Sequence, residues 1–197
     1  MPAPRLARVS DDIPALPSET LISVDIETAG PIPRQYSMLS IGACFVDEPT
    51  RTFYVELKPE VPDVIDAALA ISGLSMADLE TDGTDPAAAM RDFAEWLTNE
   101  VPANSLPVFV GFNAVFDWMF VDDYFHRLLG HNPFGHTAID IKSYALGILG
   151  GTWTQTSMRY LSPRFLGGRK LAHNALGDAQ DQAELFRAIR SEKEKRQ

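Results

Sequence analysis

The first third of the chain carries apolar residues in runs of strand length. Residues 21–27 and 37–46 are largely apolar, and residues 51–57 alternate between apolar and polar positions. A period of two places successive side chains on opposite faces of a strand, so the third run is typical of a strand with one buried face. We therefore predict three strands here, with the third lying beside the second.

The rest of the chain alternates between helical and strand patterns. In residues 86–100, Ala89, Phe93 and Leu97 recur at helical spacing, which predicts an amphipathic helix. The wholly apolar residues 106–111 are typical of a strand in the middle of a sheet. The remaining patterns predict a strand over 137–141 and helices over 115–129, 142–149 and 174–189. Together these elements predict an α/β fold with a mixed five-stranded sheet flanked by helices.

Chain length and proline placement predict the domain limits. A chain of 197 residues suits one compact domain. Residues 1–19 contain prolines that interrupt regular structure, so we predict an irregular arm there. Residues 191–197 are nearly all charged and are expected to form a tail at the fraying end of the last helix. The working domain is therefore expected to span residues 20–190.

The overall composition narrows the possible functions. The single cysteine, Cys44, lies in an apolar stretch, which indicates a buried thiol, a reducing compartment and hence a cytoplasmic protein. No segment resembles a signal peptide or approaches the ~20 apolar residues that a membrane span needs. The formal net charge of −10 argues against a protein that grips long nucleic acid over its whole surface. Any nucleic-acid activity must then depend on local basic groups and bound cations.

Two carboxylates stand at the end of the first predicted strand. Asp25 and Glu27 are two residues apart, so both side chains point to the same face. Burying two like charges side by side is costly unless a cation compensates them, and oxygen ligands favour Mg²⁺ or Mn²⁺. The alternative is that the strand simply ends there and both side chains are solvated.

Two further polar motifs follow later in the chain. Asp117 falls in the first turn of a helix after an apolar strand, at the sheet edge where open α/β folds bind ligands. Alternatively, Asp117 complements the dipole of that helix. His173 precedes the last helix, and Asp178 shares a helical stripe with Gln182 at the margin of the buried face. A lone histidine before a helix is as readily a surface or capping residue. The other histidines have only that interpretation: His126, His131 and His136.

Taken in order, these motifs resemble those of the DEDDh (DnaQ-like) 3′→5′ exonuclease family. Asp-x-Glu begins at Asp25, Asn-x-x-x-Asp at Asn113 and His-x4-Asp at His173, and the resemblance runs over residues 21–189. Within this family, the sequences of residues 24–30 and of Asn-Pro-Phe at 132–134 most resemble ribonuclease T.

The resemblance implies a ribonuclease H-like fold whose first three strands are antiparallel. It also implies a hydrolase that releases 5′-monophosphates from the 3′ end of single-stranded RNA or DNA, with RNA trimming favoured. A DNA proofreading or repair exonuclease remains open, and so does a catalytically inactive nucleic-acid-binding module.

The resemblance also assigns roles to the motif residues. Asp25, Glu27 and Asp178 would ligate a first Mg²⁺ or Mn²⁺, and Asp25 would bridge to a second ion whose waters Asp117 would hold. His173 would take a proton from the water on the first metal, because an imidazole titrates near neutral pH.

Substrate contacts are expected beside the first two motifs. Thr28, Ala29, Asn113 and Phe116 would contact the terminal nucleotide, with Phe116 stacking on a base. Other candidates for stacking or wedging are as readily core residues: Tyr36, Met38, Trp118 and Phe120.

A basic patch before His173 would guide the strand, or else it forms a solvated loop. Its members are Arg159, Arg164, Arg169 and Lys170. The chain also departs from the family in two respects. Many members carry a histidine where this chain has Phe112, which should affect packing more than chemistry. Ribonuclease T is a dimer, so the resemblance allows a homodimer, although the first third of this chain lacks an equivalent basic cluster.

Overall fold

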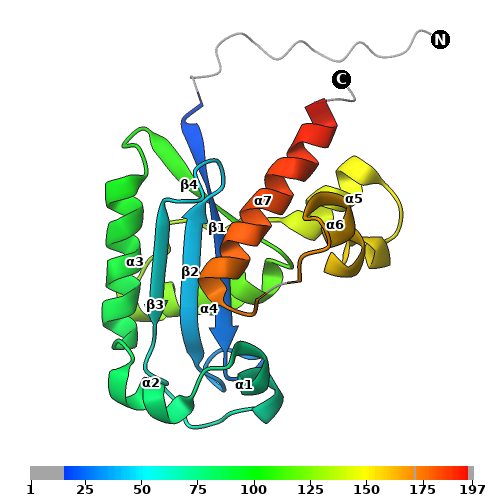
Figure 1. Cartoon of the computed structure of the whole chain (residues 1–197). Helices are drawn as coiled ribbons and strands as arrows, with labels where there is room; N and C mark the ends of the chain where they lie inside the picture. Colours follow the sequence, from blue (N-terminus) through cyan, green and yellow to red (C-terminus); the bar gives the residue numbers. More distant parts are fainter. Residues whose placement is uncertain (1–15, 171, 195–197) are drawn as a thin grey trace, which may run out of the picture.

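The fold is a five-stranded sheet with helices on both faces (Figure 1). The computed structural model describes residues 16–170 and 172–194. The strands are β1 (Ser18–Thr28), β2 (Met38–Phe45), β3 (Thr52–Glu56), β4 (Ser105–Gly111) and β5 (Ala138–Asp140). Their order is β3-β2-β1-β4-β5, with β1, β2 and β3 antiparallel and with β4 and β5 parallel to β1. The predicted mixed sheet and its antiparallel first three strands are therefore confirmed.

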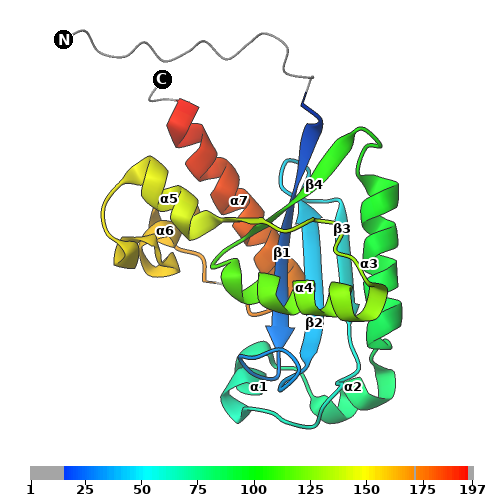
Figure 2. The ribbon, with the colours of Figure 1, turned by 180° about the vertical axis from the view of Figure 1, so that it is seen from behind.

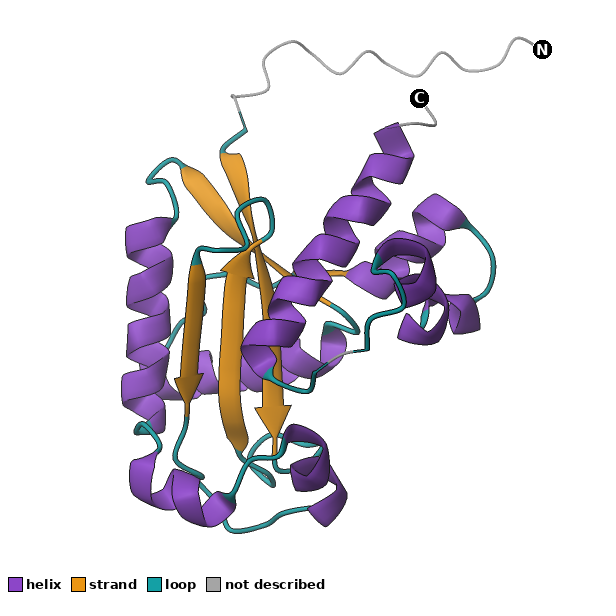
Figure 3. Ribbon diagram, in the orientation of Figure 1, coloured by secondary structure: helices purple, strands orange, loops and turns teal. Residues whose placement is uncertain are grey.

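Seven α-helices and one 3₁₀ helix surround the sheet in the described part of the chain (Figure 3). They are α1 (Asp66–Ser72), α2 (Met76–Asp82), α3 (Pro86–Glu100), α4 (Val115–Leu129), α5 (Ile141–Leu149), η1 (Trp153–Thr156), α6 (Met158–Phe165) and α7 (Ala175–Glu194). The predicted helices correspond to α3, α4, α5 and α7. The sequence analysis missed α1, α2, η1 and α6, and α1 shows why, because it has no buried residue and so presents no apolar stripe. The sequence analysis missed α6 for another reason, because it contains Pro163, and proline is unfavourable inside a helix.

The limits of the domain differ slightly from those expected. β1 begins at Ser18, within the predicted arm, because Ser18 pairs with Ser105 of β4. α7 continues to Glu194, beyond the predicted end of the domain. Residues 1–15 and 195–197 lie outside the described part, so the remainder of the arm and the tail stay predictions. Cys44 is a buried free thiol, as expected.

The two faces of β1 meet different helices (Figures 1 and 2). Ile22, Val24 and Ile26 are buried with the aromatic residues of α3 and α4. The alternate residues, which include Asp25 and Glu27, point to the opposite face, which α7 crosses. One strand therefore supplies both an apolar core and a row of polar side chains.

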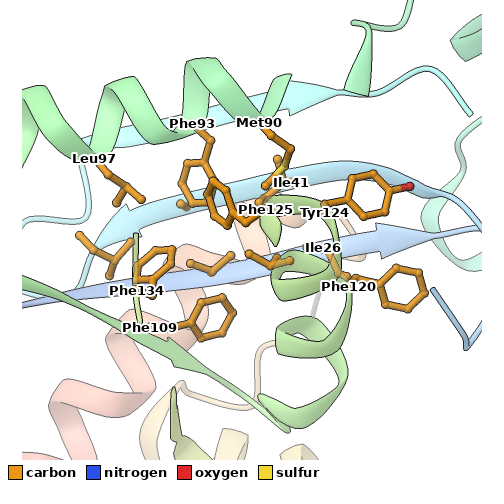
Figure 4. Packing of buried hydrophobic residues seen from close by; sticks show 14 of the residues in the cluster. Ile26, Ile41, Met90, Phe93, Leu97, Phe109, Phe120, Tyr124, Phe125 and Phe134 are labelled. Atoms are coloured by element: carbon orange, nitrogen blue, oxygen red, sulfur yellow. The ribbon is translucent and has the colours of Figure 1, made fainter. Parts of the chain in front are cut away.

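Aromatic rings fill the core on the α3 and α4 face (Figure 4). The ring of Phe93 stacks on Phe53 with centroids 4.9 Å apart and on Phe125 with centroids 5.6 Å apart. Phe134, from the Asn-Pro-Phe segment, packs edge-on against Phe109 at 5.4 Å. These contacts anchor α3 and α4 to the sheet, because offset and edge-to-face rings pack favourably at such distances.

The opposite face brings α7 very close to β2. A Cβ atom on Gly42 would lie 2.3 Å from backbone atoms of Ala175 and Leu176, so only glycine fits at this position. Gly42 is also the register partner of Asp25 on β1. The close approach therefore sets the first turn of α7, which carries Asp178, beside the acidic end of β1.

Candidate active site

Three carboxylates from two elements converge at the end of β1. Asp25 and Glu27 come from β1, and Asp178 comes from the first turns of α7. One ligand oxygen from each lies within 4.8 Å of the others. Residues more than 150 positions apart in the chain thus form one compact acidic cluster.

Backbone amides hold Asp178 in place. The N–H of Ala172 donates to its Oδ1 at 2.8 Å, and the N–H of His173 donates to its Oδ2 at 3.1 Å. His173 has a φ of 53°, in the left-handed region that a non-glycine residue seldom adopts. The turn before α7 is therefore shaped so that both amides face one carboxylate.

Gln182 connects the acidic cluster to the loop after β4, and the sequence analysis did not identify this role. Its Nε2 donates to Asp25 Oδ1, and its Oε1 accepts the N–H of Phe112 at 2.9 Å. Gln182 is almost fully buried and lies four residues after Asp178, on the same side of α7. That helical stripe was visible in the sequence, but nothing there revealed the partners of the amide.

Asp117 lies beside the cluster rather than within it. It is 5% exposed, and its Oδ1 accepts the N–H of Ile26 at 3.2 Å, between Asp25 and Glu27. The turn that leads into α4 depends on Asn113, which has a φ of 61°, and on Asp140, whose Oδ2 accepts the N–H of Ala114 at 2.9 Å. Asp140 is a second contribution that the sequence analysis missed.

The acids shift one another's titration. Burial, followed by the charges of Asp117, Asp178 and Glu27, raises the pKa of Asp25 well above its usual range, although the hydrogen bond from Gln182 opposes the shift. Burial and then Asp178 raise the pKa of Glu27 to about 7. Burial raises the pKa of Asp117 to about 8, against the amides that stabilise its charge. Burial raises the pKa of Asp178 as well.

This chemistry fits a divalent cation. The four side chains offer only carboxylate oxygens, which are the ligands that Mg²⁺ and Mn²⁺ prefer. Burial raises all four pKa values, and the charges of neighbouring acids raise those of Asp25 and Glu27 further. A cation would relieve that repulsion, so the residues present fit a metal site.

The remaining predicted site residues border the cluster in different ways. His173 is exposed and lies in the turn before α7. Thr28 is buried and donates its hydroxyl to the carbonyl of Gly30 at 2.9 Å. Ala29 is buried, and its carbonyl accepts the N–H of Ile65 at the start of α1. The latter contact places α1, which the sequence analysis missed, next to this part of the site.

The predicted stacking residues divide into accessible and buried ones. Asn113 is exposed, and Phe116 is half-buried with its ring 5.6 Å from that of Phe120. Phe120 and Met38 are fully buried and belong to the core. The ring of Tyr36 lies against Gly30, where any side chain on residue 30 would collide with it. The role of Phe116 in stacking, like every substrate contact, stays a prediction.

Two of the four bases before His173 are tied to α7. Arg164 pairs with Glu192 at 3.2 Å, and Arg169 pairs with Glu184 at 3.0 Å and also with Asp181. Only Arg159 and Lys170 of the predicted patch therefore lack an ion pair with a described residue, and the role of the patch in guiding a strand stays a prediction. Phe112 packs against buried apolar residues of α5 and α7, and its backbone N–H donates to Gln182.

Comparison with known proteins identifies the family. The family model RNase_T, described as "Exonuclease", matches residues 22–186. The chain belongs to this exonuclease family. The exonuclease match covers every residue of the acidic cluster, and it makes the chain a DEDDh-type 3′→5′ exonuclease, an enzyme that hydrolyses nucleic acid. The family depends on divalent metal ions.

Individual relatives support the exonuclease family and its fold. The 3′-5′ DNA exonuclease Cap18 of Escherichia coli is 48% identical over 182 residues, which cover 90% of this chain and 95% of Cap18. The nuclease domain of 3′hExo, a DEDDh family member bound to rAMP, matches with a TM-score of 0.67 at 13% identity, over 88% of this chain and 91% of that one.

E. coli exonuclease I in complex with a dT13 oligonucleotide matches with a TM-score of 0.70 at 18% identity, over 90% of this chain. The chain spans only 42% of the exonuclease I chain. At such low identity, the last two comparisons show the ribonuclease H-like fold alone.

Within the described residues, no helix has both the length and the apolar character that a membrane crossing needs.

Proposed function

We propose that this exonuclease removes 5′-monophosphates one at a time from the free 3′ end of single-stranded DNA, with two Mg²⁺ or Mn²⁺ ions. The observation that carries the proposal is the cluster of Asp25, Glu27 and Asp178, whose ligand oxygens lie within 4.8 Å of one another with Asp117 beside them. Two ions at such a site would stabilise the attacking and the leaving oxygen of an in-line displacement at phosphorus. Asp25, Glu27 and Asp178 would hold the first ion, and Asp25 and Asp117 the second.

His173 is the proposed general base. It is exposed at the mouth of the cluster, and its backbone is fixed by the hydrogen bond to Asp178. An imidazole nitrogen there can accept the proton of the attacking water as the bond between phosphorus and the 3′ oxygen of the preceding nucleotide breaks. His173 is thus free to move a proton, because no described residue engages its ring in a hydrogen bond.

The terminal nucleotide is proposed to lie over Thr28 and Ala29, with Asn113 and Phe116 beside it. The hydroxyl of Thr28 is held by the carbonyl of Gly30, and the backbone of Ala29 is held by Ser37 and Ile65, so these two residues are already fixed in place. Phe116 is half-buried and can present one face to a base. A paired base cannot reach Phe116 without first being unpaired, at a cost of a few kcal/mol, so hydrolysis should slow sharply at duplex.

DNA is the preferred substrate in this proposal because the DNA exonuclease Cap18 is 48% identical to the chain over 90% of its length. RNA trimming, which the likeness to ribonuclease T favoured, becomes the second candidate and is not confirmed. An inactive binding module is the candidate of another class, and all five predicted catalytic residues argue against it. The homodimer and the cytoplasmic location also remain predictions.

One assay tests this proposal. Single-stranded DNA and RNA of equal sequence, labelled at the 5′ end, are incubated with the protein and Mg²⁺ or Mn²⁺, with EDTA as the control. We expect ladders shortened from the 3′ end, 5′-monophosphate products, faster digestion of DNA, and an intact circular single strand. Faster digestion of RNA would favour the ribonuclease. Cleavage of the circle or 3′-phosphate products would refute an exonuclease mechanism, and a lack of both hydrolysis and metal binding by calorimetry would favour the binding module.

A further inference from the structure

The charge of this acidic chain is distributed very unevenly. The chain has 27 acidic and 17 basic residues, yet residues 141–177 contain no Asp or Glu at all. Their charged side chains are all basic: Lys142, Arg159, Arg164, Arg169 and Lys170. This acid-free segment forms α5, η1, α6 and the turn into α7, and it lies on the opposite side of α7 from α3 (Figure 1).

The five bases fall into two groups. Arg164 and Arg169 neutralise acids on α7, which gives them a structural role. Lys142, Arg159 and Lys170 form no ion pair with any described residue, and Arg159 and Lys170 are exposed. Three positive charges are thus not neutralised by an acid of the described chain: those of the exposed Arg159 and Lys170, and that of the half-buried Lys142, whose Nζ lies near the rings of Trp153 and Phe112.

Exposed aromatic rings accompany these free bases. Trp153 is 51% exposed, with the Lys142 Nζ 4.4 Å from its ring centroid. Tyr160 is 47% exposed and lies next to Arg159 on α6. Large exposed rings beside cations are what single-stranded nucleic acid needs, because bases stack on the rings while phosphates contact the cations.

The basic surface continues into the candidate active site. A groove of about 570 Å³ is lined by Arg159 and Pro163 of α6, by Arg169 and Lys170 of the following turn, and by His173. Lys170 is two residues from Ala172, whose N–H binds Asp178. A polyanion lying in this groove would therefore reach the acidic cluster at one end.

We propose that the acid-free segment is a binding track for the single strand that enters the site, contacting phosphates through Lys142, Arg159 and Lys170 and bases through Trp153 and Tyr160. This inference rests on the proposed exonuclease function and adds the surface that binds the nucleotides 5′ of the one removed. It also explains how a chain with a net charge of −10 can bind nucleic acid, since the track is locally positive and ends where metal ions would neutralise the acids.

The test compares two double variants that remove equal charge. Arg159→Ala with Lys170→Ala removes the track's exposed bases. Arg91→Ala with Lys193→Ala removes two bases from α3 and from the far end of α7, and these also form no ion pair with a described residue. Binding of 20-nucleotide single-stranded DNA and RNA is measured in EDTA by fluorescence anisotropy at several salt concentrations. Hydrolysis of the same strands and of a dinucleotide is measured with Mg²⁺ or Mn²⁺.

The track variant should bind the 20-mer about tenfold more weakly, with the slope of log affinity against log salt reduced by roughly 1.4. Its kcat/KM for the 20-mer should fall about tenfold relative to its kcat/KM for the dinucleotide. The control variant should retain both properties. Equal losses in the two variants, or wild-type binding by the track variant, would overturn the track.

Stacking is tested separately at Trp153. Trp153→Ala should weaken binding of the 20-mer at least about fivefold, whereas Trp153→Phe should preserve most of it, because a phenyl ring still stacks. Wild-type binding by Trp153→Ala would show that the ring of Trp153 is not part of the binding track. Failure of the wild-type protein to digest any strand would refute the exonuclease proposal, while the binding in EDTA would still decide whether the track exists. The DNA and RNA arms distinguish which nucleic acid occupies it.

Discussion

One face of β1 carries Ile22, Val24 and Ile26 into a core of aromatic rings, whereas the other carries Asp25 and Glu27 toward α7. The apolar face gains stability from burial and ring packing without unsatisfied charge. The α7 face gathers carboxylates whose pKa values are all raised by burial, and those of Asp25 and Glu27 are raised further by the charges of neighbouring acids. Alternate residues of one strand therefore have different roles: those on one face stabilise the fold, and those on the other concentrate negative charge.

The same contrast appears in residue size. The apolar face is filled by large rings such as Phe93 and Phe125. The α7 face also holds large apolar residues, but where α7 approaches the sheet it has small ones, with Gly42 against Ala175 and with Ala179 and Ala183 fully buried. Small residues let a helix backbone approach a strand closely, and that approach positions Asp178. We expect the two faces to respond to mutation in different observables: the apolar face in stability, the α7 face in rate.

His173→Ala should produce the largest effect on rate. Loss of one general base typically lowers the rate ~10²–10⁴-fold, while the backbone bond from residue 173 to Asp178 does not need the imidazole. Metal binding, measured by calorimetry, and the melting temperature should stay near wild type. His131→Ala is the control, because it removes an exposed histidine after the far end of α4, ~20 Å along that helix from Asp117. Near-wild-type turnover by His173→Ala would assign the base to another group.

Gly42→Ala should affect both rate and stability through geometry alone. The new methyl would meet the backbone of α7 at 2.3 Å, so the helix must shift and carry Asp178 away from Asp25. A misplacement of ~1 Å can lower a rate ~10²-fold, and overpacking typically costs ~1–3 kcal/mol of stability.

The matched control for this substitution is Gly147→Ala, in α5, where an added Cβ meets nothing within 4 Å. It should leave the rate unchanged and raise stability by ~0.5–1 kcal/mol. Rates per active site and denaturant melts decide between the outcomes. If Gly42→Ala kept both wild-type rate and stability, the close helix approach would not position the site.

Phe93→Ala should affect stability without a specific effect on rate. Its ring contacts Phe53, Phe125 and Trp96, and removal of a buried phenylalanine typically costs ~3–5 kcal/mol. The rate per folded molecule, measured well below the melting temperature, should remain close to wild type. Leu106→Ala, at a side chain that is 54% exposed, should change stability by less than ~0.5 kcal/mol. A large loss of rate in folded Phe93→Ala would show that the two faces are coupled.

The sequence predicted most of the difference between the two faces of β1, because that difference depends on the order of residues within single elements. The alternation along β1 identified Asp25 and Glu27 as residues sharing a face, and the apolar run of β4 predicted that Asp117 would lie at the sheet edge. What the sequence did not reveal depends on contacts between distant segments. Gln182 joins Asp25 to Phe112, and Asp140 fixes the turn before α4, but neither partner can be read from spacing along the chain.

The basic patch illustrates the same limit. Five bases without an acid over residues 141–177 are visible in the sequence. Only the folded chain separates Arg164 and Arg169, which pair with α7, from Arg159 and Lys170, which do not. Side-chain partners across elements therefore decide which charges remain available for a ligand.

The smallest expected effect is a change in melting temperature, and it is the most direct test of the repulsion between Asp25 and the neighbouring acids. Without metal, Asp25→Asn should raise the melting temperature at neutral pH, because an uncharged amide keeps the oxygen that accepts from Gln182 and removes one charge beside Glu27. A relief of one kcal/mol corresponds to roughly 2–4 °C for a domain of this size. Asp92→Asn on α3, an exposed acid, is the control and should leave the melting temperature unchanged.

The pH dependence of melting fixes the sign of this effect. Glu27 has a pKa of about 7 in the folded chain, above its ordinary 4.5, and the pKa of Asp25 is raised as well. The folded state then binds more protons at these two groups than the unfolded state, so their contribution to the stability of metal-free wild type is fully present below pH ~4.5 and is lost as the pH rises through about 7. Asp25→Asn should flatten this decline, and the gap between variant and wild type should close toward pH 4. Saturating Mg²⁺ should remove the decline in wild type, because the bound cation favours the ionised acids. Two results would contradict the conclusion that the fold holds repelling carboxylates together. One is a metal-free wild type that gains stability between pH 5 and pH 8. The other is an Asp25→Asn variant that melts below wild type without metal.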